Sequence, residues 1–200
     1  MGVEQAGRLG ASFLGFVCYP PSPRYVDPAR ARDLVAAVPE GVETVGLVVD
    51  AADGEIETIL QTVPFDLLQL HGYETPDRVA EIVLRFGCRV IKALRAETPA
   101  DLEALSAYAE VADMILFDAK PPRDAAFPGG HGLAFDWRLL DGVALERPWL
   151  LAGGLNAGNV AAAVALTGAP IVDVSSGVES SPGVKDPGKL EAFFAAALRA

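Results

Sequence analysis

Short apolar runs alternate with helical patterns along almost the whole of this 200-residue chain, and this alternation restricts the possible folds more than any other feature. Strictly alternating strands and helices predict a parallel sheet, because parallel neighbours need a crossover connection. The apolar runs of strand length cover residues 13–18, 44–49, 67–70, 89–93, 114–117, 149–151 and 171–174. The helical patterns between them cover residues 28–38, 54–62, 76–86, 99–107, 135–140, 157–166 and 187–198.

Four of the helical patterns begin with the same local signal, a capping residue directly before a proline. The side-chain oxygen of the first residue accepts a hydrogen bond from an N–H of the first turn, and proline suits the first helical position. These pairs are Asp27 with Pro28, Thr75 with Pro76, Thr98 with Pro99, and Asp186 with Pro187.

Three glycine-bearing loops in the last third of the chain indicate the kind of ligand. They read FPGGHG (127–132), AGGLN (152–156) and VSSGVE (174–179). Glycine lets the backbone approach a bound group closely, and the N–H groups at a helix start attract anions. The alternation alone also fits an open doubly wound sheet, but phosphate loops after the last two strands are typical of a (β/α)8 barrel. We therefore expect a single α/β domain over residues 1–200, a (β/α)8 TIM barrel that binds a phosphorylated small molecule.

The expected barrel lacks one strand at its front. Eight strands close such a barrel, but only seven runs are visible, and the chain begins on a helical pattern at residues 3–9. A missing strand would leave two unpaired sheet edges, which natural proteins avoid. We therefore expect the first strand to be absent from this chain.

Composition and charge exclude several classes of protein. Hydrophobic residues make up 51% of the chain, and a net charge of −11 argues against nucleic acid as the main partner. The two cysteines, Cys18 and Cys88, form neither a disulfide framework nor a pattern of metal ligands. The sequence shows no secretory leader and no apolar run of the ~20 residues that a bilayer requires. We therefore expect a cytoplasmic protein that binds no metal and no membrane.

Asp118 is the main candidate for acid chemistry. It follows the run MILF and so belongs to the C-terminal ends of the strands, where barrel enzymes have their active sites. Asp113 precedes that run and belongs to the opposite end. A carboxyl group partly enclosed by apolar neighbours can have its pKa raised enough to deliver a proton. The alternative is a structural role, in which Asp118 pairs with Lys120 or caps a loop.

Other polar residues near strand ends have a functional and a structural interpretation. Arg24, in the proline-rich segment YPPSPRYV, could hold a carboxylate through two parallel hydrogen bonds or could be an ordinary surface arginine. His71 follows the strand run within the segment LLQLHG, and His131 lies in a glycine loop. Each could exchange protons, contact a phosphate or be structural. Cys18 could act as a thiolate base, but the role of a small buried residue suits it better.

Six segments together resemble one enzyme family. They are GFVCYPPSPRYV, LLQLHG, ILFDAK, PGGHGLAFDW, LAGGLNAGNV and VDVSSGVESSPGVKD. In these segments the chain is similar to the phosphoribosylanthranilate isomerases of tryptophan biosynthesis. The segments occur in the family's order, and the resemblance covers nearly the whole chain from Gly10. The resemblance implies a (β/α)8 barrel that needs no cofactor.

The resemblance also implies a reaction and a set of site residues. The family converts N-(5-phosphoribosyl)anthranilate into 1-(2-carboxyphenylamino)-1-deoxyribulose 5-phosphate by an Amadori rearrangement, in which an acid opens the sugar ring and a base removes the C2 proton. Asp118 would be the acid, and Arg24 would hold the anthranilate carboxylate. The glycine loops would hold the phosphate and cover the sugar. Besides Arg24, the expected substrate-binding residues are His71, Gly130, Gly132, Gly153, Gly154, Ser176 and Gly177.

One motif of the family has no counterpart here. The family's base is a cysteine in a KICG motif at the end of the first strand, and this motif is not in the chain. We expect a wrongly assigned start codon as the reason. Cys18 does not replace the base, since it lies in what would be the second strand. His131 stands where the family commonly has threonine.

Three functions are compatible with these observations. The leading hypothesis is the isomerase, impaired without the missing strand and acting as a monomer or homodimer. A sister phosphate-binding barrel enzyme is the second, but the segments SPR and PGGHGLAFDW count against it. The third is a catalytically silent barrel that binds phosphorylated ligands, although the joint presence of Asp118 and Arg24 favours an enzyme.

Overall fold

A computed structural model describes residues 2–120, 132, 134–143 and 145–200. Seven strands form one parallel sheet, in which strands that follow one another in the chain lie side by side. The strands are β1 (Phe13–Val17), β2 (Glu43–Val48), β3 (Leu67–Leu70), β4 (Arg89–Ala96), β5 (Met114–Ala119), β6 (Trp149–Leu151) and β7 (Ile171–Val172). The prediction of a parallel α/β sheet from seven apolar runs is confirmed.

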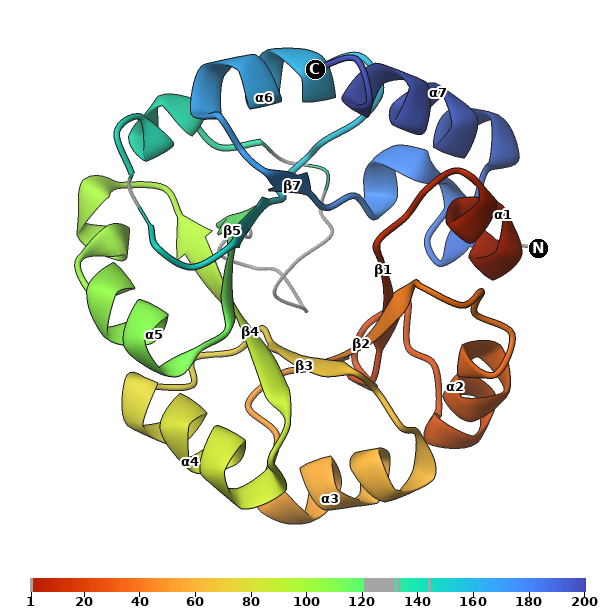
Figure 1. Ribbon diagram of the computed structural model, residues 1–200, viewed down its shortest axis with the longest axis vertical. Coiled ribbons are helices and arrows are strands. Elements are labelled where there is room, and N and C mark those ends of the chain that lie inside the picture. The colour runs from red at the N-terminus through yellow and green to blue at the C-terminus, as the bar shows by residue number, and fades with distance from the viewer. Residues whose placement is uncertain (1, 121–131, 133, 144) are drawn as a thin grey trace.

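Helices surround the curled sheet on its outer side (Figure 1). The α-helices are α1 (Gly2–Arg8), α2 (Pro28–Val35), α3 (Asp53–Thr62), α4 (Pro76–Phe86), α5 (Leu105–Val111), α6 (Val160–Thr167) and α7 (Pro187–Ala197). The short 3-10 helices are η1 (Pro99–Leu102), η2 (Trp137–Leu140) and η3 (Ser176–Val178). All four predicted proline starts are therefore confirmed, and Asp27, Thr75 and Asp186 accept hydrogen bonds as N-caps.

Apolar side chains pack on both faces of the sheet. One core cluster consists of strand residues and Ala152, directly after β6, and it fills the inside of the ring. A second, larger cluster joins the other face of the strands to the helices. Side chains alternate between these two clusters, as the period of two along a strand requires. The inner cluster contains Val45, Leu67, Ile91, Ala93, Met114, Leu116, Leu150 and Ala152.

The ring of strands is open between β1 and β7. In the described part of the chain no ladder joins these two strands, so each has a free edge. The ring of helices closes outside this gap, where α1 lies against α7 (Figure 1). There the side-chain amide of Gln5 donates to the carbonyl oxygen of Pro187 at 3.2 Å and to Glu191 Oε1 at 3.3 Å. An open wall at this place agrees with the expected lack of the first strand.

Some expected helices differ from those observed. Residues 99–107 divide into η1 and the start of α5, and residues 135–140 form only η2. The helix expected from residue 157 begins at Val160, because Asn156 first forms a turn in which its Oδ1 accepts from the N–H of Gly158 at 2.8 Å. The hairpin of β8 (Glu179–Ser181) and β9 (Val184–Lys185) was not expected at all. These segments are short, and their form depends on contacts with other loops.

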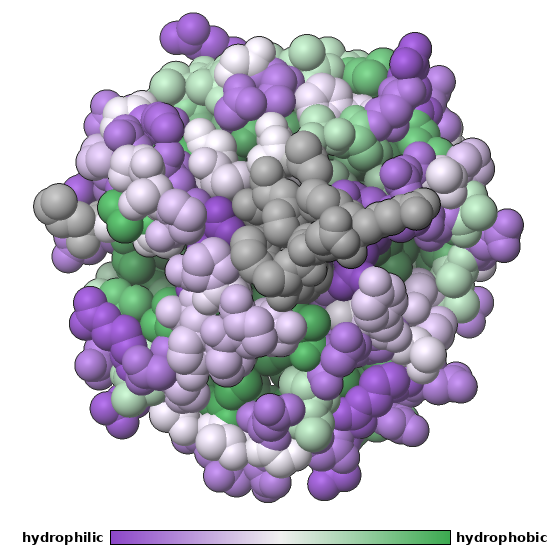
Figure 2. All heavy atoms as spheres, turned by 180° about the vertical axis from the view of Figure 1, so that it is seen from behind, coloured by the Kyte–Doolittle hydropathy of each residue, from purple (hydrophilic) through white to green (hydrophobic). Residues whose placement is uncertain are grey.

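The molecular surface is hydrophilic at its periphery. Figure 2 shows polar and charged side chains projecting around the edge, with apolar patches between them. None of the helices that the structure describes is both long and apolar enough to cross a bilayer.

Candidate active site

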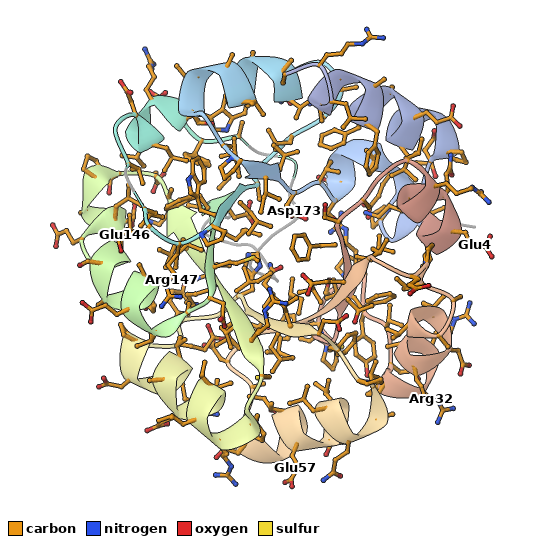
Figure 3. All side chains as sticks on the ribbon, in the orientation of Figure 1. Glu4, Arg32, Glu57, Glu146, Arg147 and Asp173 are labelled. Carbon is orange, nitrogen blue, oxygen red and sulfur yellow. The ribbon has the colours of Figure 1, made fainter. Side chains whose placement is uncertain are left out.

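The alternation of side chains along the strands selects which polar residues face the inside of the ring. On β5, Leu116 belongs to the inner cluster, so Asp118, two residues further on, points to the same side. His71, Arg95 and Asp173 likewise lie an even number of positions after inner residues of β3, β4 and β7, so they also point to the inside of the ring. Figure 3 shows Asp173 within the ring of strands. Four ionisable side chains from four strand ends therefore converge on one end of the barrel, the end expected for Asp118.

His71 and Asp118 are in contact. The Nε2 atom of His71 lies 3.2 Å from Oδ2 of Asp118, and both side chains are buried. The two groups are not aligned for a hydrogen bond, and Nε2 has no other hydrogen-bond partner among the described residues. The side-chain amide nitrogen of Gln69 lies 2.9 Å from Nδ1 and donates to it, so a neutral His71 carries its proton on Nε2, facing Asp118.

Asp173 adds a second carboxyl group to this cluster of side chains. Asp173 is an exposed residue by its accessible surface, although protein atoms partly enclose its carboxyl group. This burial and the negative charge of Asp118 raise the pKa of Asp173, while Lys185 and His71 partly offset the rise. Because like charges repel at short range, the negative charge of Asp118 favours the protonated form of Asp173.

Arg95, on β4, connects this strand with the loop after β3. It is the register partner of Asp118 across β4 and β5. Its Nη2 donates to the carbonyl oxygen of His71 at 3.0 Å, and its guanidinium lies 4.1 Å from the ring centroid of the exposed Tyr73. Arg95 thereby holds the backbone that carries His71.

The glycine loops after β6 and β7 touch each other. A Cβ atom on Gly177 would overlap the carbonyl oxygen of Leu155, so only glycine fits there. Gly153 has φ +83°, and a Cβ atom on it would lie 2.8 Å from the amide nitrogen of Ala119. A Cβ atom on Gly132 would lie 3.6 Å from Ser176 Oγ, which brings the third glycine loop to the same place. Gly130 and His131 lie outside the described residues.

These loops present free backbone N–H groups. No hydrogen bond between described residues uses the N–H of Gly154, Ser176 or Gly177. Such groups, with a serine hydroxyl among them, suit the oxygens of a phosphate. Among the described residues no group of three or more His, Cys, Asp or Glu side chains is arranged to hold a metal ion.

Arg24 is neither free nor on the open surface. Its Nε lies 2.9 Å from Oε1 and 3.1 Å from Oε2 of Glu179, and its Nη2 lies 2.7 Å from Oε2. The pair joins the loops after β1 and β7 across the open part of the sheet. The alternative of an ordinary surface arginine is therefore wrong, and the guanidinium lies at the same end of the barrel as Asp118.

Cys18 points away from the inside of the ring. It packs in the cluster between the sheet and the helices and is 8% exposed. Burial raises the pKa of its thiol to about 11, so the thiol keeps its proton at neutral pH. The expectation that Cys18 is a small buried residue is confirmed.

Lys120 and Asp113, two charged residues near Asp118 in the sequence, have structural roles. Lys120 pairs with Glu97 and Asp101 rather than with Asp118. Asp113 lies at the opposite end, as expected, where its Oδ2 accepts from the N–H of Val90 at 2.8 Å.

Three residues of the site were missed in the sequence. Asp173 and Glu179 lie within the segment VDVSSGVE. Arg95 lies on β4, on the same side of the strand as the inner residues Ile91 and Ala93. Counting in steps of two from the apolar inner residues would have found Arg95 and Asp173. Nothing local indicates Glu179, because its partner Arg24 is 155 positions away.

Comparisons with known proteins agree with this geometry. A family model described as N-(5'phosphoribosyl)anthranilate (PRA) isomerase matches residues 2–196. An N-(5'-phosphoribosyl)anthranilate isomerase of Paracoccus denitrificans is 56% identical over 196 residues, which are 98% of this chain and 91% of that protein.

Solved structures show the same architecture. The phosphoribosyl anthranilate isomerase of Thermotoga maritima superposes with a TM-score of 0.87 at 34% identity, over 100% of this chain and 94% of that one. A phosphoribosyl anthranilate isomerase in complex with reduced 1-(o-carboxyphenylamino)-1-deoxyribulose 5-phosphate gives a TM-score of 0.83 at 32% identity, over 100% and 93% of the two chains.

Proposed function

The chain belongs to the N-(5'-phosphoribosyl)anthranilate isomerase family of tryptophan biosynthesis, and we propose that it isomerises N-(5'-phosphoribosyl)anthranilate with the residues described above. The product is 1-(2-carboxyphenylamino)-1-deoxyribulose 5-phosphate. The observation that carries the proposal is the convergence of Asp118, the phosphate-type glycine loops and Arg24 at one end of the barrel. The reaction takes place in the cytoplasm, and the enzyme is a monomer or a homodimer.

Asp118 is the acid that protonates the ring oxygen of the sugar. Its side chain is 10% exposed, points to the inside of the ring and contacts His71. One of its oxygens, Oδ1, accepts from the N–H of Ala119 at 2.8 Å, which leaves Oδ2 on the side of His71. The contact at Gly153, whose missing Cβ would lie 3.4 Å from Oδ1, puts the acid beside a phosphate loop.

The substrate has two charged ends that the site can hold at once. The free N–H groups of Gly154, Ser176 and Gly177, together with Gly132, bind the phosphate. Arg24 binds the carboxylate of the anthranilate ring. With both ends held, the sugar lies over Asp118 and His71, and the reacting atoms are oriented without a cofactor.

The second proton transfer needs a base at the same end of the barrel. Cys18 cannot supply it, because its thiol is buried on the other face of the sheet. We propose that a cysteine on a strand paired with the free edges of β1 and β7 is the base, as the family's KICG motif implies. Such a strand would also remove the two open sheet edges.

A turnover assay that follows the loss of anthranilate fluorescence tests the proposal. The chain as it stands should turn over slowly, and a version extended at its N-terminus by a strand with the KICG motif should be fast. In the extended version Asp118→Asn should lower kcat by about 100-fold or more while the fold persists. Near-normal turnover of that variant would remove Asp118 as the acid. Ligand binding without turnover in both versions would instead favour the catalytically silent barrel.

A further inference from the structure

The loops that follow β1 and β7 meet through the ion pair of Arg24 with Glu179. Three N–H···O contacts of 2.7 to 3.1 Å connect Nε and Nη2 of the guanidinium with both oxygens of the carboxylate. The two side chains are only 10% and 4% exposed. A pair that is bidentate and enclosed holds the planar guanidinium in one orientation.

This orientation leaves one edge of the guanidinium unused. No hydrogen bond between described residues uses Nη1 of Arg24. Glu179 occupies the side edge, formed by Nε and one N–H of Nη2. The end edge, formed by Nη1 and the second N–H of Nη2, is still able to bind a carboxylate through two parallel hydrogen bonds.

Glu179 is itself held in place by two lysines. Nζ of Lys185 lies 3.1 Å from Oε1 of Glu179 and 3.0 Å from the carbonyl oxygen of Ser175, in the loop after β7. Nζ of Lys189 lies 2.6 Å from the carbonyl oxygen of Glu179. Burial opposes ionisation of Glu179, but the hydrogen bond from Arg24 and the charge of Lys185 outweigh it, and its pKa lies below the ordinary value. Glu179 is therefore a fixed anion.

We propose that Glu179 is a positioning residue that turns the free edge of Arg24 toward the carboxylate of the substrate. The inference rests on the proposed function, in which Arg24 binds that carboxylate. A free arginine side chain has many rotamers, and holding it in advance removes the cost of ordering it from the binding step. Glu179 does not touch the substrate in this arrangement and acts through Arg24 alone.

Calorimetric titration of the full chain with two ligands tests this role. The first ligand is reduced 1-(2-carboxyphenylamino)-1-deoxyribulose 5-phosphate, and the second is the same compound without the ring carboxylate. In Glu179→Gln the affinity for the first ligand should fall by about tenfold or more, and that for the second should change by less than about threefold. The control variant Glu81→Gln removes an exposed ion pair with Arg78 on α4 and should change neither.

A double variant separates positioning from a general structural effect. If Glu179 acts through Arg24, the variant carrying both Arg24→Lys and Glu179→Gln should bind the first ligand no more weakly than Arg24→Lys alone. Equal weakening of both ligands in Glu179→Gln, or no weakening, would overturn the proposal. If the unmodified chain bound both ligands equally well, Arg24 would not bind the carboxylate and this inference would fail, while the membership of the isomerase family would stand.

One further measurement needs no change at Glu179. The Nε–H signal of Arg24 in a nitrogen NMR spectrum, assigned by its loss in Arg24→Lys, reports directly on the ion pair. The signal should be protected from exchange in the ligand-free chain and keep its position when the first ligand binds, because Glu179 retains Nε. A large shift on binding would mean that the ligand takes the side edge, and the proposal would be overturned.

Discussion

Lys92 and Glu74 form a buried ion pair at the C-terminal end of the sheet, with Nζ 2.6 Å from Oε2 and exposed fractions of 2% and 3%. The ammonium group also donates to the carbonyl oxygens of Leu70 and Gly72. Glu74 in turn accepts from the N–H groups of Asp50 and Gly72. Burial lowers the pKa of Lys92, although the charge of Glu74 opposes this. The pair thus ties together the ends of β2, β3 and β4 beside the site.

Lys92→Met should destabilise the fold strongly. Removing one partner leaves the Glu74 carboxylate buried and without its counter-charge, which typically costs about 3–5 kcal/mol. Urea unfolding followed by circular dichroism measures the loss. Lys120→Met is the matched control, because Lys120 makes only exposed ion pairs, and its midpoint should stay close to that of the unmodified chain. An unchanged midpoint for Lys92→Met would show that the pair does not stabilise this end of the sheet.

Gly177→Ala should weaken binding of phosphorylated ligands. The added Cβ atom would overlap the carbonyl oxygen of Leu155, so one of the two touching glycine loops must move. We expect the affinity for the reduced product analogue to fall by about tenfold and the free energy of unfolding to fall by about 1–3 kcal/mol. Gly54→Ala serves as control, because a Cβ atom there, on α3, meets open space. Unchanged affinity in Gly177→Ala would contradict the assignment of the phosphate site.

Cys18 should react slowly with thiol reagents in the folded chain. Its thiol is buried and has a pKa of about 11, so little thiolate exists at about pH 8. Cys88 is more exposed, although burial raises its pKa too, and should react first. The two rates can be separated in Cys18→Ser and Cys88→Ser variants with a disulfide reagent, and both thiols should react rapidly in denaturant. Fast labelling of Cys18 in the native chain would reopen it as a candidate base.

The ion pair at Glu179 should lose its contribution to stability in acid. The folded-state pKa of Glu179 lies below the unfolded value of about 4.3, so the contribution is complete above that value and is lost as the pH falls through the folded pKa. The difference in unfolding free energy between the unmodified chain and Glu179→Gln should therefore be largest near about pH 6 and shrink below about pH 4. A difference that grows in acid would refute the lowered pKa.

Much of the fold was determined by local properties of the sequence. All seven apolar runs form strands, and helices start at Pro28, Pro76, Pro99 and Pro187. Both signals, a short apolar run and a capping residue before proline, depend only on residues that are neighbours in the chain. The location of Asp118 was also predictable, because a residue that ends a parallel strand must lie at the C-terminal end of the sheet. The hairpin of β8 and β9 was not, since Glu179 in it is held by Arg24 from the loop after β1 and by Lys189 on α7.

Only the tertiary structure decided which side chains meet. Lys92 and Glu74 lie 18 positions apart, and Arg24 and Glu179 lie 155 apart, so no periodicity or spacing connects either pair. The sequence by itself determined the order and direction of the strands and thus the end of the barrel at which the site lies. The partners of the charged groups in the site are set by the curled sheet, which brings the loops after β1 and β7 together. Such ion pairs are strengthened by enclosure within the protein, and this enclosure exists only in the folded chain.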